Sequence, residues 1–147
     1  MHHYSKNPAK IWVLMLVGVW LGGCAAGSTL QEVKAARGTG QTQEFKIPFE
    51  QIWSGLPDAL ERANLVVVEI NKNDGYIMAQ NPPSFMKSGE NIVVFVQDMQ
   101  QGRTLVEVIS KNASSAMLSE NSEKSILNSI SVKMWDRYGG MPDSAIK

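Results

Sequence analysis

Cysteine and histidine are almost absent from this chain of 147 residues. It has one cysteine, Cys24, and two histidines, His2 and His3, both at the extreme N-terminus. If that end is removed in the mature protein, no histidine remains, which excludes hydrolysis by a histidine-assisted nucleophile and zinc sites built on histidine and cysteine. A single cysteine also cannot form a disulfide within the chain. The residues that follow it, Ala25, Ala26, Gly27 and Ser28, supply no base or cation to activate a thiolate.

The chain also lacks net charge. Fourteen basic residues balance fourteen acidic ones, and the basic residues are scattered singly among acids. Binding to a phosphate backbone would need a clustered basic face, so no nucleic-acid partner is expected. A hydrophobic content of 44% with 19% charged residues is typical of one globular domain rather than a disordered chain.

The only long apolar run, residues 11–21, is too short to span a membrane, which needs about 20 apolar residues. It follows a basic start that contains Lys6 and Lys10, and small residues come after it. A basic segment, a short apolar segment and small residues in that order are typical of an export signal. The sequence therefore predicts a signal peptide over residues 1–23.

Leu21-Gly22-Gly23-Cys24 resembles the lipobox of bacterial lipoproteins, in which an aliphatic residue and two small residues precede a cysteine. The resemblance implies cleavage before Cys24 and a covalent lipid on its sulfur, with no other cofactor. Ala25 in place of aspartate implies sorting to the outer membrane, facing the periplasm. An intermolecular disulfide or an idle thiol are the alternative interpretations of Cys24.

The stretch from Cys24 to residue 43 is small and polar and predicts a flexible tether, with one short helical patch around Leu30 to Ala36. As a coil of 19 residues from Ala25 to Gln43, it would reach about 25 Å. The folded domain is expected over residues 44–140, and residues 141–147 form a C-terminal tail. Within the domain, alternating apolar residues predict a first strand over 44–49.

A helix is expected over residues 50–64, bent or split by Gly55 and Pro57. Asn73-Asp74-Gly75 predicts a hairpin turn between two strands, and two more strands follow on either side of Gln101-Gly102. A closing helix over 119–138 carries one apolar face. The fold class is therefore α+β, in the order β-α-β-β-β-β-α, with an antiparallel sheet covered on one face by two helices.

Residues 49–80 resemble the helix-grip domains of the lipoprotein BamC, an accessory subunit of the outer-membrane β-barrel assembly machinery. The resemblance implies an envelope lipoprotein with one helix-grip-like module. It is carried by core and turn residues and therefore bears on fold more than on function. The matching positions are Phe49, Ile52, Trp53, Pro57, Ala59, Leu60, Glu61, Arg62, Gly75 and Tyr76.

Catalysis is not expected, and no catalytic or metal-binding residue is assigned. The carboxylate pairs that remain conceivable are Glu61 with Glu69 and Asp98 with Glu107, all best interpreted as solvent-facing. Gly38-Thr39-Gly40 has no strand before it, so it does not form a phosphate-binding loop.

Two non-enzymatic functions remain. The first is a protein-interaction module that docks onto an envelope assembly through Phe85 and Met86, on a loop, and Trp135, near the end of the closing helix; these aromatic residues could instead pack in the core. The second is a carrier or sensor of a small apolar ligand held under the closing helix. Its cavity would be lined by methionines that could equally well fill the core, namely Met78, Met99, Met117 and Met134.

Overall fold

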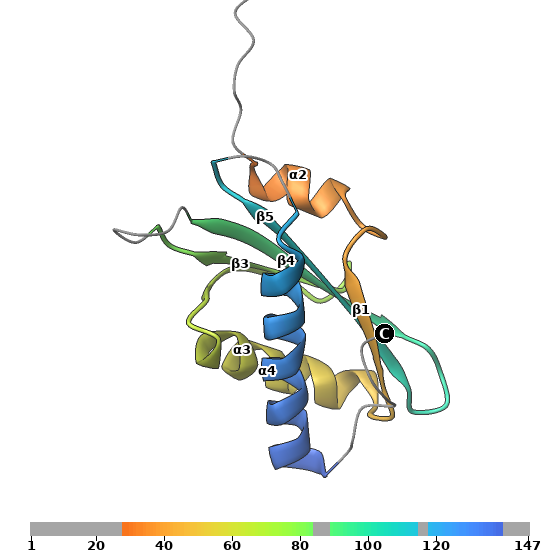
Figure 1. Cartoon of the computed structure of the whole chain (residues 1–147). Helices are drawn as coiled ribbons and strands as arrows, with labels where there is room; N and C mark the ends of the chain where they lie inside the picture. The colour runs from red at the N-terminus through yellow and green to blue at the C-terminus, as the bar shows by residue number, and fades with distance from the viewer. Residues whose placement is uncertain (1–27, 84–88, 115–117, 140–147) are drawn as a thin grey trace, which may run out of the picture.

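The protein folds as a five-stranded antiparallel sheet with helices on both faces (Figure 1). The structure, a computed structural model, describes residues 28–83, 89–114 and 118–139. The predicted α+β class, with two helices covering one face of the sheet, is confirmed. The elements are α2 (Leu30–Ala35), β1 (Gln41–Phe45), α3 (Phe49–Arg62), β2 (Val66–Asn71), β3 (Tyr76–Asn81), β4 (Glu90–Asp98), β5 (Thr104–Asn112) and α4 (Glu120–Tyr138).

The strand order is β1-β5-β4-β3-β2. The last four strands are antiparallel neighbours in chain order, as their short connections predict. The turn at Asn73-Asp74-Gly75 joins β2 to β3, and Gly75 has a φ of +69°, which glycine adopts without strain. β1 lies beside β5, so the first and last strands are adjacent and β2 forms the opposite edge.

One face of the sheet packs against α3 and α4. Ile52, Leu56 and Leu60 of α3 and Leu127 and Ile130 of α4 are buried against it. The helix α3 is continuous from Phe49 to Arg62, so the expected split at Gly55 and Pro57 does not occur. Gly55 instead lets α4 approach closely, because a Cβ there would lie 2.5 Å from the terminal methyl of Met134.

The other face of the sheet is covered by α2, which confirms the short helical patch around Leu30 to Ala36 but corrects the expectation of a flexible tether up to residue 43. Val33 of α2 is fully buried, and the helix contacts β4 and β5. The described folded part begins at Ser28, well before the expected boundary at residue 44. The second apolar cluster consists of Val33, Tyr76, Met78, Val93, Phe95 and Ile109, with Leu30 and Ala36 packed against it.

The physical reason is that β4 is apolar on both faces, so each face needs cover from water. A capping box starts α2: the Thr29 hydroxyl accepts from the N–H of Glu32 at 3.2 Å, and the Glu32 carboxylate accepts from the N–H of Thr29 at 2.7 Å. Lys34 then lies over the ring of Tyr76, 4.0 Å from its centroid. These contacts hold a short helix that would be marginal by itself.

Among the residues that the structure describes, no helix has both the length and the apolar character needed to cross a membrane.

Candidate functional site

The residues proposed as sites from the sequence fall into two groups. Cys24, Phe85 and Met86 lie outside the described residues. Trp135 lies on α4 with 47% of its surface exposed, and Val132, one turn earlier, is 48% exposed. Trp53 is only partly buried, at the rim of the core, where its ring stacks on Phe49 with centroids 5.6 Å apart.

The described methionines of the carrier interpretation do not come together. Met78 is buried under α2, whereas Met134 belongs to the buried face of α4, on the opposite side of the sheet. Met99 is partly exposed beside the turn between β4 and β5, and Met117 lies outside the described residues. The space between the sheet and its two long helices is occupied by buried side chains.

The carboxylate pairs do not assemble either. Asp98 accepts a hydrogen bond from the backbone N–H of Gln100 at 2.8 Å. Glu107 is buried, so the expectation of a solvent-facing side chain is wrong there, and its Oε1 accepts from the N–H groups of Gly38 and Gly40 at 2.7 and 3.0 Å. The N–H of Thr39 donates to the carbonyl oxygen of Ala36 at 3.1 Å. The backbone donors of Gly38-Thr39-Gly40 are therefore taken by this protein's own carboxylate and carbonyl rather than offered to a phosphate.

The other two carboxylates, Glu61 and Glu69, do not form a pair either. Glu69, in β2, accepts a hydrogen bond from the Tyr76 hydroxyl, while Glu61 lies in the last turn of α3. Within the described ranges, no cluster of three or more ligating side chains could hold a metal ion.

A buried carboxylate that the sequence did not single out is Glu123, only 2% exposed on the inner face of α4. Its Oε1 accepts from the N–H of Ser110 at 2.9 Å and its Oε2 from the N–H of Gln41 at 3.2 Å. Burial raises the pKa of Glu123, and the two backbone donors act in the opposite direction. Glu123 therefore joins α4 to β5 and β1. The sequence signal for its burial is its spacing, because Glu123 lies four residues before Leu127, on the apolar face of the helix.

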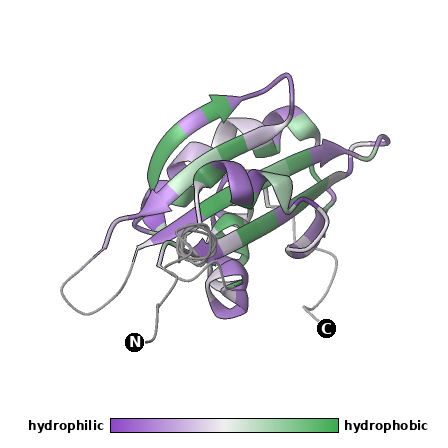
Figure 2. Cartoon of the chain, turned by 90° about the horizontal axis from the view of Figure 1, so that it is seen from above, coloured by the Kyte–Doolittle hydropathy of each residue, from purple (hydrophilic) through white to green (hydrophobic). Residues whose placement is uncertain are grey.

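The edge strand β2 exposes several large apolar side chains to water. Val66, Val68 and Ile70 are 57%, 50% and 53% exposed, and no strand lies beyond β2 in the described part of the sheet. In Figure 2 the outermost strand at the upper edge is green apart from one purple band. The opposite edge strand, β1, reads Gln-Thr-Gln-Glu-Phe and buries only its phenylalanine. The sheet therefore has one polar edge and one apolar edge.

A β-bulge shapes the apolar edge. Val67 pairs with Ala79 and Glu69 pairs with Met78, so Val68 is an extra residue without a partner on β3. Because the bulge changes the alternation, Val66 and Ile70 lie on opposite faces of the sheet. Apolar side chains are thus offered on both faces, and the bulge disfavours indiscriminate pairing between flat edges.

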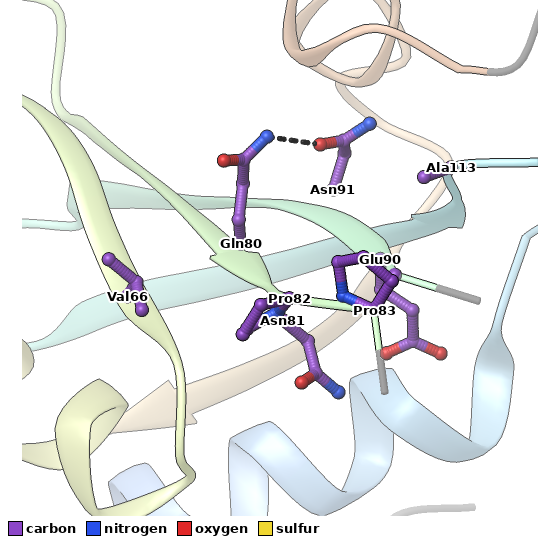
Figure 3. Close-up of a pocket in the computed structure, with 9 residues that line it drawn as sticks. Val66, Gln80, Asn81, Pro82, Pro83, Glu90, Asn91 and Ala113 are labelled. Atoms are coloured by element: carbon purple, nitrogen blue, oxygen red, sulfur yellow. Dashed lines mark hydrogen bonds between the residues drawn. The ribbon is translucent and has the colours of Figure 1, made fainter. Parts of the chain in front are cut away.

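A groove begins where this edge begins, at Val66, with a volume of about 240 Å³ (Figure 3). Its polar side is held by a hydrogen bond of 2.9 Å from Gln80 to Asn91. The groove lies at the end of the sheet rather than under α4, and it is small for a carried ligand, so it fits a side chain better. Its lining residues are Val66, Gln80, Asn81, Pro82, Pro83, Gly89, Glu90, Asn91 and Ala113.

No protein-family model matches this chain, and no curated protein matches it significantly. What the protein does must therefore follow from its own residues and their arrangement. The described residues define a small α+β domain whose most distinctive surface is the apolar edge at β2, with the groove that continues from Val66.

Proposed function

We propose that this protein is a lipid-anchored periplasmic lipoprotein whose folded domain is a non-enzymatic interaction module of an envelope assembly. The lipobox-like Leu21-Gly22-Gly23-Cys24 supports the anchor, and Ala25 supports an outer-membrane address. The absence of any histidine after His3 supports a non-enzymatic role.

The partner is an extended segment of another envelope protein, added as a strand along β2. The observation that carries this proposal is the edge itself, with Val66, Val68 and Ile70 each at least half exposed. An edge strand offers a row of backbone donors and acceptors, and an added strand satisfies them. Apolar residues along the incoming segment would contact the valine and isoleucine side chains, and the groove at Val66 would take one further side chain.

The polar character of the β1 edge explains why the β2 edge is favoured for the added strand. Exposed β-branched side chains gain free energy when water is removed from them, at about 25 cal/mol per Å² of apolar surface. The side chain of Thr42, the exposed second residue of β1, offers little of that gain. A strand added at β2 is therefore more stable than one added at β1.

Site-specific photocrosslinking in living cells tests the partner. A photoreactive amino acid at Val68 is expected to capture one envelope protein through an extended, apolar segment identified by mass spectrometry. The same probe at Thr42 is the matched control on the other edge and should not capture that segment. Val66→Lys combined with the probe at Val68 should abolish capture, because a charged side chain blocks an apolar edge. Capture from both edges alike, or capture that survives Val66→Lys, would contradict the proposal.

The anchor is tested separately by mass spectrometry of the purified protein. Loss of residues 1–23 and addition of diacylglyceryl and acyl groups to Cys24 are expected. Cys24→Ala should leave an unmodified chain that no longer fractionates with membranes. A wild-type chain without lipid would contradict the anchor while leaving the interaction at β2 open to its own test.

A further inference from the structure

Ser28, the first residue that the structure describes, is fixed to the end of the sheet. It is buried, and its hydroxyl donates to the carbonyl oxygen of Asn112 at 2.8 Å. The side-chain amide of Asn91 donates to the carbonyl oxygen of Ser28. The helix α2 starts two residues later and buries Val33 in the second apolar cluster. The chain is therefore held to the domain from Ser28 onward.

Because Ser28 is fixed to the sheet, the chain between the domain and the lipid anchor is shorter than the sequence predicted. Only Ala25, Ala26 and Gly27 separate Cys24 from Ser28. Fully extended, four steps of chain span at most about 14 Å between the two Cα atoms. A coil over the whole polar stretch would have allowed about 25 Å. Given the lipid anchor of the proposed function, on which this inference rests, the domain cannot stand away from the bilayer.

One end of the sheet faces the lipid as a result. Asn91 lies near the start of β4 and Asn112 at the end of β5. The antiparallel pairing brings the end of β3 and the start of β2 to the same end. The opposite end carries the turn at residues 72–75 and the turn at residues 99–103. We propose that the Ser28 end of the domain rests directly on the bilayer surface and contacts lipid, while the two turns point away from the membrane.

The chemistry of this end fits a lipid surface. Leu118 and Val66 are large apolar side chains that lie there 48% and 57% exposed. Leu118 is tied to this end by its bridge to Lys111 of β5. The acidic Glu90 accepts hydrogen bonds from the hydroxyls of Ser119 and Ser122 at 3.0 and 2.8 Å. Apolar side chains beside a cation at Lys111 suit the boundary between acyl chains and anionic headgroups.

The orientation also sets the direction of the apolar edge. β2 starts at Val66, at the lipid end, and runs toward Asn71 at the far end. Its edge therefore extends from the bilayer into the periplasm. A partner segment would be received within one domain length of the membrane, and the groove beside Val66 would lie next to the headgroups.

Depth-dependent fluorescence quenching tests this orientation. The lipidated protein has no free thiol, so one introduced cysteine takes one dye. Ser114→Cys places the dye at the Ser28 end, and Asn73→Cys places it on the far turn; both positions are exposed. The proteins are reconstituted in vesicles of phosphatidylethanolamine and phosphatidylglycerol that contain spin-labelled lipid as quencher. The dye at position 114 is expected to lose most of its fluorescence, and the dye at position 73 should match a soluble reference.

An insertion variant is the control for proximity. A Gly-Ser segment of about 12 residues between Gly27 and Ser28 lengthens the connection to an r.m.s. reach of about 22 Å. Quenching at position 114 should fall, because the short connection no longer forces contact. Equal quenching at positions 114 and 73 in the native chain, with the protein still on the vesicles, would overturn the orientation alone. A chain that does not float with vesicles and carries no lipid would overturn both the anchor and this inference.

Discussion

The side-chain amide of Asn91 donates a hydrogen bond to the carbonyl oxygen of Ser28 and joins β4 to the first described residue of the chain. The same side chain accepts from Gln80 of β3 at 2.9 Å. Asn91 is buried, so its bond to Ser28 lies away from water, whereas the bond from the exposed Gln80 is only partly buried. One amide thus connects the first described segment of the chain with two central strands.

Replacing Asn91 should loosen that connection. Asn91→Leu leaves the carbonyl of the buried Ser28 without this partner, and an unpaired buried polar group costs about 1–3 kcal/mol. We expect a lower free energy of unfolding and faster amide hydrogen exchange in α2. Gln97→Leu, an exposed amide of the same strand, is the matched control and should leave both unchanged. Equal exchange in the two variants would mean that Asn91 does not hold the segment.

Val33 tests whether residues 28–43 are a folded layer rather than a tether. Val33 is fully buried against the second apolar cluster. Val33→Ala should lower the free energy of unfolding by about 1.5–3 kcal/mol, the amount that burial of such a side chain contributes. Gln31→Ala, on the exposed side of the same helix, should have little effect in the same urea titration. A Val33→Ala variant as stable as the wild type would restore the tether.

Glu123 should give the stability a specific dependence on pH. Burial raises its pKa in the folded state above the ordinary value, so folding favours the protonated form. Its contribution to the free energy of unfolding is therefore largest below its ordinary pKa and is lost as pH rises through the raised pKa. Relative to Glu123→Gln, the wild type should lose stability in urea titrations as pH rises from the ordinary pKa of a glutamate through the raised pKa of Glu123.

Glu120, three residues earlier, is the control of opposite sign. Its hydrogen bond with Lys124, at 2.7 Å, lowers the pKa of Glu120. Its small contribution to stability is present above its ordinary pKa and is lost as pH falls. Relative to Glu120→Gln, the wild type should therefore lose stability as pH falls, the reverse of the trend for Glu123. The same trend in both variants would contradict the assignment to burial of Glu123.

Gly40 and Gly55 should respond differently to the same substitution. A Cβ at Gly40 would lie 2.2 Å from the carbonyl oxygen of Val108, whereas a Cβ at Gly55 meets the end of the flexible Met134 side chain. Gly40→Ala must displace β1 from β5 and should cost about 1–3 kcal/mol or more. Gly55→Ala regains about 1 kcal/mol of helix propensity, which offsets the movement of Met134. Thermal denaturation that ranks the two in the reverse order would contradict this packing.

Local features of this fold could be predicted from the sequence, whereas features that depend on long-range contacts could not. The hairpin at Asn73-Asp74-Gly75, the closing helix and the α+β class could be predicted, because turn chemistry and apolar periodicity are read from neighbouring residues. The cover of the second face by α2 could not, since the few apolar residues of that segment gain burial only against strands distant in the chain. The short helix itself was expected around Leu30 to Ala36, and the capping box at Thr29 and Glu32 is a further local signal for it.

The sequence by itself determined the elements of the fold, the absence of histidine after residue 3, and the cysteine pattern from which an anchor is proposed. Only the tertiary structure decided that β2 is an edge, that Val66, Val68 and Ile70 are exposed there, and that Glu123 is buried. Strand order and solvent exposure are properties of the assembled sheet. The same valines would be core residues in a central strand, and only the position of β2 at the end of the sheet leaves them facing water.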